Sequence, residues 1–83
     1  MQFKGTIHIR LKSGHSDPEG ETAAQSLRDL RYSVQDVRVV KIYEIILTAT
    51  SHQQAEQHVE EMCKRLLANP IKDEYTYVIE EMG

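Results

Sequence analysis

The pattern of hydrophobic and polar residues predicts a strand near each end of the chain. Residues 2–12 alternate, with apolar side chains at odd positions and polar side chains at even positions. Residues 75–80 alternate in the same way, with Tyr75, Tyr77 and Ile79 in one row. The first strand is therefore expected to present one face to water or to a polar partner.

The stretch VQDVRVVKIYEIILTA, residues 34–49, does not follow this alternation. Apolar residues occupy most of its odd positions, and Val40, Ile42 and Ile46 occupy even positions as well. Residues 33–36 are interpreted as a short link, and no Gly, Pro or Asn interrupts the middle of the segment that follows. The pattern therefore predicts one long strand over residues 37–49 rather than a hairpin. A bend or bulge near Val40–Lys41 would explain the shift in phase. Both faces of this strand are predicted to need cover.

Two amphipathic helices are predicted between the strands. Asp17 before Pro18 is a helix-start signal, and apolar residues at helical spacing extend the first helix to about Leu30. Ser51 begins the second helix, which ends before Pro70. The apolar stripe of the second helix comprises Ala55, Val59, Met62 and Leu66, widened by Cys63 and Leu67.

The order strand, helix, strand, helix, strand predicts an α+β fold of two layers, with both helices on one face of a three-stranded sheet. Nothing in a chain of 83 residues remains to cover the other face. Exposed apolar patches of this kind usually mark an interface. The economical occupant is a second copy related by a two-fold axis, and Val40, Ile42 and Ile46 are predicted to mediate this self-association.

The amino-acid composition limits the classes of partner and the cellular compartment that we expect for the chain. The net charge is −3, whereas a nucleic-acid-binding face must be basic. No apolar run approaches the ~18 residues of a membrane span. The single cysteine, Cys63, excludes an internal disulfide framework and fits a reducing cytosol. We therefore expect a cytoplasmic protein without a membrane or nucleic-acid partner.

Catalytic and cofactor-binding motifs are missing from the sequence. There is no phosphate-binding loop, no dinucleotide fingerprint and no nucleophile elbow. Cys63 lies beside the apolar stripe of the second helix, which predicts a buried, unreactive thiol. None of the four histidines pairs with another at the spacing of a helical metal site, and no second cysteine could complete a zinc site. We expect no catalytic, cofactor-binding or metal-binding residues.

Four charged residues flank or interrupt the long apolar stretch: Asp36, Arg38, Lys41 and Glu44. Charges within so apolar a segment need partners. They fit two interpretations equally well. They are either solvated edges joined by a salt bridge or the polar rim of a contact patch that meets a partner.

Four stretches together resemble the PurS family, the small subunit of phosphoribosylformylglycinamidine synthase in purine biosynthesis. Asp17-Pro18-Glu19-Gly20 matches D-P-x-G, and Val34 to Arg38 matches V-x-x-V-[RK]. Lys41 and Glu44 match K-x-x-E, and the segment from Met62 to Pro70, MCKRLLANP, is close to M-C-x-K-L-L-A-N-P and runs on to Tyr75. The order and spacing also match over nearly the whole chain, so the resemblance implies one PurS-like domain over residues 1–83.

The sequence departs from the family pattern at two positions. Val40 stands where the family usually has glycine, so a bend there cannot rely on the conformational freedom of glycine. Lys72 stands where the family usually has an apolar residue, which puts the packing of the turn into the last strand in question.

The resemblance implies a connecting role rather than a reaction. The small subunit of this family resembles a self-associating adaptor, a dimer or tetramer, that holds a glutaminase subunit, PurQ, against a synthetase subunit, PurL. The glutaminase releases ammonia, and the synthetase uses ATP to convert formylglycinamide ribonucleotide to formylglycinamidine ribonucleotide. ATP, Mg and glutamine would then be used by the partner subunits, and the adaptor would be a required but non-catalytic subunit of the ligase.

An alternative interpretation is a regulatory domain of the ACT type that binds a small molecule at a dimer junction. That fold would require residues 37–49 to form two strands with a turn, and no turn residues are present. A stand-alone enzyme is disfavoured because the catalytic motifs are missing.

Overall fold

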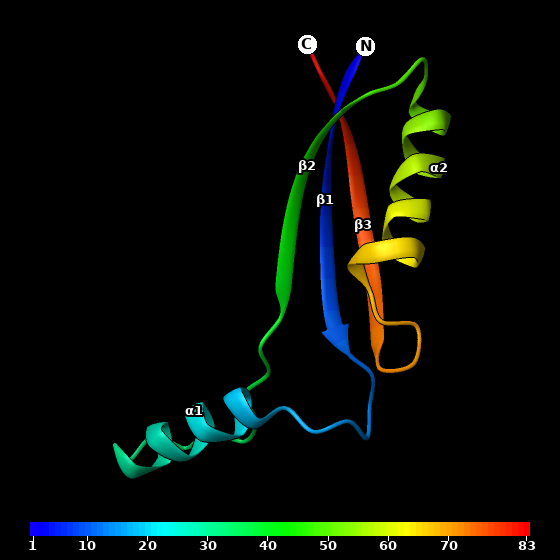
Figure 1. Cartoon of the computed structure of the whole chain (residues 1–83). Coiled ribbons are helices and arrows are strands. Elements are labelled where there is room, and N and C mark those ends of the chain that lie inside the picture. The colour runs from blue at the N-terminus through cyan, green and yellow to red at the C-terminus, as the bar shows by residue number, and fades with distance from the viewer.

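The computed structural model describes all 83 residues and confirms the predicted order of elements. The chain forms β1 (Gln2–Leu11), α1 (Pro18–Asp29), β2 (Lys41–Thr48), α2 (His52–Met62) and β3 (Asp73–Met82), and a π-helical turn over Cys63–Leu67 continues α2. The sheet has the order β2-β1-β3, and both pairs of neighbours are antiparallel (Figure 1). Only one strand forms within residues 37–49, whereas the ACT-like alternative required two.

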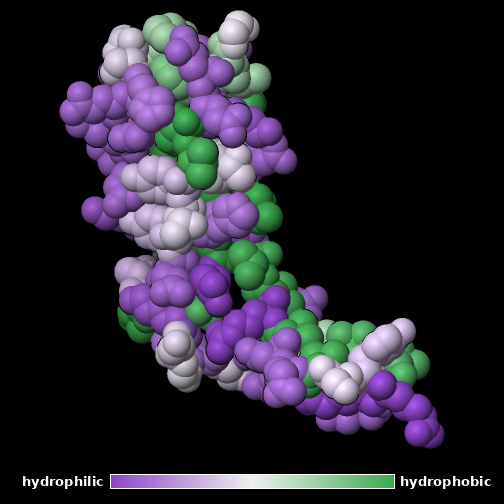
Figure 2. Space-filling view, turned by 180° about the vertical axis from the view of Figure 1, so that it is seen from behind, coloured by the Kyte–Doolittle hydropathy of each residue, from purple (hydrophilic) through white to green (hydrophobic).

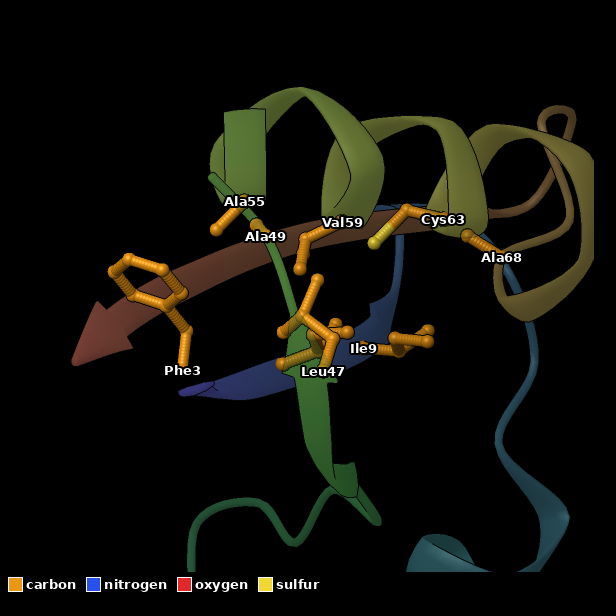
Figure 3. Packing of buried hydrophobic residues seen from close by; sticks show 9 residues of the cluster. Phe3, Ile9, Leu47, Ala49, Ala55, Val59, Cys63 and Ala68 are labelled. Carbon is orange, nitrogen blue, oxygen red and sulfur yellow. The ribbon is translucent and has the colours of Figure 1, made fainter. Parts of the chain in front are cut away.

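The hydrophobic core lies between helix α2 and one face of the sheet, here called the inner face. Phe3 and Ile7 of β1 are fully buried, and so are Val59 and Cys63 on the helical side (Figure 3). Gly5 lies in the same row of β1, and a Cβ at this position would be 3.2 Å from a methyl group of Val59. The missing side chain at position 5 therefore lets α2 approach the central strand closely.

Helix α1 does not lie where the sequence analysis placed it. It does not pack on the sheet but projects from the end of the sheet opposite the chain termini (Figure 1). Residues 12–40, which we call the arm, carry α1 outward and bring the chain back. The amphipathic pattern of α1 indicated an apolar stripe but could not show which surface the stripe meets. The prediction that both helices cover one face is therefore wrong, because α2 alone covers it.

The two ends of α1 have well-defined backbone caps. Asp17 is the N-cap, and its side chain accepts a hydrogen bond from Gly20 N–H, as predicted. The C-terminal end is a Schellman motif in which Tyr32 N–H donates to the Leu27 carbonyl at 3.1 Å. Arg31 occupies the left-handed position with φ of 73° and is the only non-glycine residue with positive φ.

The long apolar stretch of the sequence is divided between the arm and the sheet. Strand β2 begins only at Lys41, at the point where the phase shift predicted a bend. Residues 34–40 form the return segment of the arm and have no regular secondary structure. The apolar residues on both sides of the stretch therefore reflect two local environments, and the predicted strand over residues 37–49 was too long at its start.

The π-helical turn changes which residues of the second helix face the core. Ala68 N–H donates to the Cys63 carbonyl at 2.9 Å, five residues back instead of four. This extra residue rotates the end of the helix, so that Ala68 is buried while Leu66 is 83% exposed. Leu66 was predicted in the apolar stripe, and that prediction is wrong because the 3.6-residue period does not continue through the turn.

The molecule is extended for its size. Its radius of gyration is 16.4 Å, whereas a compact domain of this length would have about 12 Å. The accessible surface is 6173 Å², whereas a compact monomer of this mass would expose about 5,100 Å². Only 12 of the 83 residues are buried. The single chain thus leaves far more surface in water than a self-sufficient domain of the same length.

Candidate interaction site

The face of the sheet opposite α2, here called the outer face, carries apolar side chains that nothing in the chain covers. Ile42 and Ile46 of β2 are 57% and 53% exposed. The strand register places Ile46 beside Lys4 and Ile42 beside His8 of the central strand. Val78 of β3 lies on the same face beside Thr6, which is between Lys4 and His8 on the central strand, and it is also exposed. Exposed apolar side chains therefore lie on the two edge strands of the outer face, and polar side chains of β1, such as Thr6 and His8, lie between them.

Ion pairs neutralise much of the charge on the outer face. Lys4 Nζ lies 2.8 Å from a Glu44 carboxylate oxygen, and Arg10 Nε lies 3.6 Å from a Glu74 oxygen. The hydrogen bond from Lys4 lowers the pKa of Glu44, and the same bond raises the pKa of Lys4. Both partners are solvent-exposed in the single chain, so the pair contributes little to its stability. Paired charges are, however, better suited to an interface than isolated ones.

The structure separates the charged residues that the sequence analysis grouped together. Glu44 lies on the outer face between Ile42 and Ile46. Asp36 and Arg38 lie in the return segment of the arm and form an ion pair of 3.3 Å with each other. Lys41 begins β2 with its side chain on the opposite side of the sheet from Ile42, because successive residues of a strand alternate.

Val40, the third residue predicted for self-association, lies immediately before β2 and is 40% exposed. With His8 and Arg10 it lines a depression of about 600 Å³ on the outer face. Residues of β3 complete its lining: Glu74, Tyr75, Thr76 and Val78. Val78 was not predicted to belong to this surface, although its alternation with Tyr77 and Ile79 already indicated the face opposite to theirs.

A second uncovered apolar surface lies on the inner face beside α2. A groove of about 400 Å³ is lined by three apolar residues of the second helix and its π-helical turn together with Ile45 of β2. The residues that line the groove are Ile45, His58, Glu61, Met62, Arg65, Leu66 and Leu67. One helix is too narrow to cover three strands, so this part of the sheet stays open.

The arm provides a third apolar surface. Leu30 and Tyr32, at the far end of α1, are 68% and 63% exposed. Seen from the side opposite Figure 1, hydrophobic surface continues from the body of the sheet onto the arm (Figure 2). The chain therefore presents apolar surface on the outer face, in the groove and on the arm.

The side chains form no arrangement that suggests chemistry. No group of three or more His, Cys, Asp or Glu residues is placed to hold a metal ion. Burial raises the pKa of the Cys63 thiol, so it is protonated and a poor nucleophile at neutral pH. No helix is long and apolar enough to cross a membrane.

Comparison with known proteins identifies the family. The model of the family described as "PurS: Phosphoribosylformylglycinamidine (FGAM) synthase" matches residues 4–81. The chain belongs to the PurS family. It is similar to the phosphoribosylformylglycinamidine synthase subunit PurS of Archaeoglobus fulgidus, with 42% identity over 90% of this chain and 95% of that protein.

Solved PurS structures have the same fold. The structure of Thermus thermophilus PurS is 34% identical, covers both chains completely and superimposes with a TM-score of 0.89. A chain in the structure of PurLQS from Thermotoga maritima is 30% identical and gives a TM-score of 0.88 over 96% of this chain and 99% of that chain. The likeness includes the arm, because it extends over nearly the whole length of each chain.

The residues that resemble the PurS pattern have structural roles here. Asp17 and Gly20 of the D-P-x-G motif hold the base of the arm, and Glu44 of K-x-x-E pairs with Lys4. Asn69 of the A-N-P segment accepts hydrogen bonds from Ile71 and Lys72 N–H through its side-chain oxygen. Its backbone does not adopt a left-handed conformation.

The two departures from the PurS pattern fit local geometry. Val40 adopts no positive φ, so this position does not need glycine in the present chain. The Lys72 carbonyl accepts a hydrogen bond from Lys12 N–H at 2.8 Å, and the residue is exposed. The turn into β3 is thus held by backbone hydrogen bonds and does not depend on an apolar side chain at position 72.

Proposed function

We propose that this chain is the non-catalytic PurS subunit that holds a PurL synthetase and a PurQ glutaminase together in phosphoribosylformylglycinamidine synthase. The observation that carries the proposal is the PurS family match over residues 4–81. It is supported by the likeness to a chain of the PurLQS structure from Thermotoga maritima. The chain's own surface agrees with this role, since it offers exposed apolar contact area.

The chemical benefit of such a subunit is proximity. Ammonia released by a glutaminase is diluted and protonated in water before it reaches a distant synthetase. A subunit that fixes the two active sites in register turns a bimolecular encounter into a local transfer. In this proposal ATP, Mg and glutamine are bound by the partner subunits and not by this chain. The reaction belongs to biosynthesis, and with the free thiol of Cys63 this supports a cytoplasmic location.

Self-association is part of the same proposal. Val40, Ile42 and Ile46 on or beside the outer face, together with the apolar surface of the arm, would be covered by further copies of the chain in a dimer or tetramer. The surface exposed beyond that of a compact monomer is roughly 1,100 Å² per copy. A stable interface of standard size buries about 800 Å² per partner, so the excess is sufficient for one.

Reconstitution with purified PurL and PurQ tests the proposal. Size-exclusion chromatography in glutamine and Mg-ADP should show the chain comigrating with both subunits. Formation of formylglycinamidine ribonucleotide from glutamine should require the chain, whereas formation from added ammonium chloride should depend on it much less. A chain that fails to comigrate, or that leaves glutamine-dependent turnover unchanged, would contradict the adaptor role. A thermal shift with a free amino acid and no comigration would instead favour a regulatory domain.

A further inference from the structure

The arm is joined to the sheet through its two connections and, at its first residue, through hydrogen bonds from Lys12 to the Pro70 and Lys72 carbonyls in the turn before β3. Residues 12–17 lead out of β1, and the return segment leads into β2 at Lys41. Helix α1 does not pack on the sheet, so the core of the protein cannot hold the helix in place. Order within the arm must come from contacts between α1 and its own return segment.

A carboxylate fixes the base of the arm. One oxygen of Asp17 accepts a hydrogen bond from Gly20 N–H at 2.9 Å, and the other accepts one from Val39 N–H at 2.9 Å. The first bond caps α1, and the second ties the helix to the end of the return segment, 22 residues further along the chain. We call this pair of hydrogen bonds the base latch.

A guanidinium fixes the far end of the arm. Arg28 Nε donates to the Val34 carbonyl at 3.0 Å, and its Nη2 donates to the Gln35 carbonyl at 3.1 Å. The planar fork of an arginine can hold two successive carbonyls in this way, whereas a lysine cannot. We call these two hydrogen bonds the tip latch.

Between the latches, the helix and the return segment are in close contact. Gly20 is buried, and a Cβ at this position would lie 2.3 Å from the Val37 carbonyl oxygen. Ala24, one turn further along α1, is also buried. Helix α1 and the return segment therefore pack directly against each other over a small contact.

We propose that Asp17 and Arg28 are positioning residues that lock the arm into a preformed docking element for a second copy of the chain. The inference rests on the proposed function, because it assumes self-association. A free arm would have to be ordered at the moment of binding, which weakens association by the conformational entropy lost. An arm held by the two latches has already lost that entropy before it meets its partner.

The choice of a second copy follows from the surfaces of the chain itself. The arm extends beyond the compact body, so the molecule measures 51 Å along its longest axis and 14 Å along its shortest. Its exposed Leu30 and Tyr32 need an apolar partner. The same chain exposes unfilled apolar surface in the groove beside α2 and on the outer face. Two copies can therefore cover each other's exposed apolar surfaces without a further protein.

Asp17→Ser and Arg28→Lys are the informative variants. Serine keeps an N-cap for Gly20 N–H but cannot also hold Val39, so it separates helix capping from the base latch. Lysine keeps the charge at position 28 but loses the fork. Glu21→Ala and Arg31→Lys are matched controls in the first turn of α1 and just after its end, because neither side chain makes a hydrogen bond or an ion pair.

Two measurements are made on each variant of the full chain. Sedimentation equilibrium over a dilution series gives the dissociation constant of self-association. Amide hydrogen exchange by NMR at the lowest concentration reports on the arm through Gly20 and Val39 and on the sheet through Ile7. In the wild type we expect Gly20 and Val39 to be protected even when the chain is dissociated. Asp17→Ser should lose protection at Val39 alone, with Gly20 and Ile7 unchanged.

Asp17→Ser and Arg28→Lys should each weaken self-association about tenfold, whereas the two controls should stay within about twofold of the wild type. Unchanged Ile7 protection excludes a general loss of folding as the cause. Wild-type affinity in Asp17→Ser, or unprotected arm amides in the dissociated wild type, would overturn the role of the latches while leaving the proposed function intact. A wild-type chain that is monomeric at every concentration would overturn both the docking role and the proposed self-association.

Discussion

Lys4 and Glu44 form a 2.8 Å ion pair across strands β1 and β2, between the exposed side chains of Ile42 and Ile46. The pair lies on the outer face, where the proposed self-association would remove it from water. Removing one partner of a charged pair in an interface leaves the other charge unpaired and costs more than removing both. The geometry of this pair therefore allows a test that needs no knowledge of the second copy's orientation.

Glu44→Gln and Lys4→Met are each expected to weaken self-association severalfold, and the double variant is expected to weaken it less than the sum of the two. The measurement is a double-mutant cycle on dissociation constants from sedimentation equilibrium. Arg38→Met serves as a control, because its ion pair with Asp36 lies in the arm. Strict additivity of the two outer-face substitutions would show that the pair stays in water in the assembly.

Ile46→Glu places a charge in the apolar part of the outer face and should shift the chain toward monomers. The neighbouring lysine, Lys4, already pairs with Glu44, so the new carboxylate gains no free partner. Light scattering after size-exclusion chromatography gives the mass directly. Ile71→Glu is the matched control, because Ile71 is 78% exposed on the turn before β3. An unchanged mass for Ile46→Glu would remove the outer face from the proposed interface.

Val59→Ala should lower the free energy of unfolding by about 2 kcal/mol, because Val59 is fully buried between α2 and the central strand. Leu66→Ala removes more apolar atoms but should cost less than about 0.5 kcal/mol, since the π-helical turn points Leu66 away from the core. Urea denaturation of the wild type and both variants, at the same protein concentration, gives the free energies of unfolding to be compared. A larger loss for Leu66→Ala would mean that the side chain is buried in the assembly.

Cys63→Ala should leave glutamine-dependent turnover by the reconstituted complex unchanged while lowering stability by about 1–2 kcal/mol through a small cavity. Because burial raises the pKa of the Cys63 thiol, the folded chain should also react slowly with iodoacetamide at pH 7.5, and the urea-unfolded chain should react fast. Loss of turnover by an intact complex would show that the thiol takes part in the reaction.

The arm should loosen at acid pH before the sheet does. The hydrogen bonds from Val39 and Gly20 N–H lower the pKa of Asp17 below its ordinary value of about 3.9. The stabilisation of the arm by Asp17 is therefore complete above about pH 4 and is lost as the pH falls through the lowered folded value. The protection factor of the Val39 amide against hydrogen exchange should fall in that range in the wild type. In Asp17→Ser it should already be low at neutral pH and should show no such transition.

The sequence predicted the order of elements because each element carries its own local signals. Strict alternation marks β1, and the Asp17-Pro18 and Ser51 caps mark the helix starts. The outer face was also predictable, since Ile42 and Ile46 stand in even positions of a strand whose odd positions enter the core. These inferences depend only on period and capping, which are properties of short segments.

The placement of α1 could not be predicted in the same way. Its stripe shows that the helix has an apolar side, but Gly20 lies against Val37 of the return segment, and the helix does not pack on the sheet. The decisive contact joins Asp17 to Val39, and neither residue type signals a partner 22 positions away. The outward turn of Leu66 was missed for a related reason, because nothing in CKRLL distinguishes a π-helical turn from an α-helix.

Both ends of the chain lie together, since Gln2 pairs with Met82 across neighbouring strands at the end of the sheet remote from α1 (Figure 1). A fluorophore or affinity tag attached at either end would therefore report on the protein without obstructing the arm.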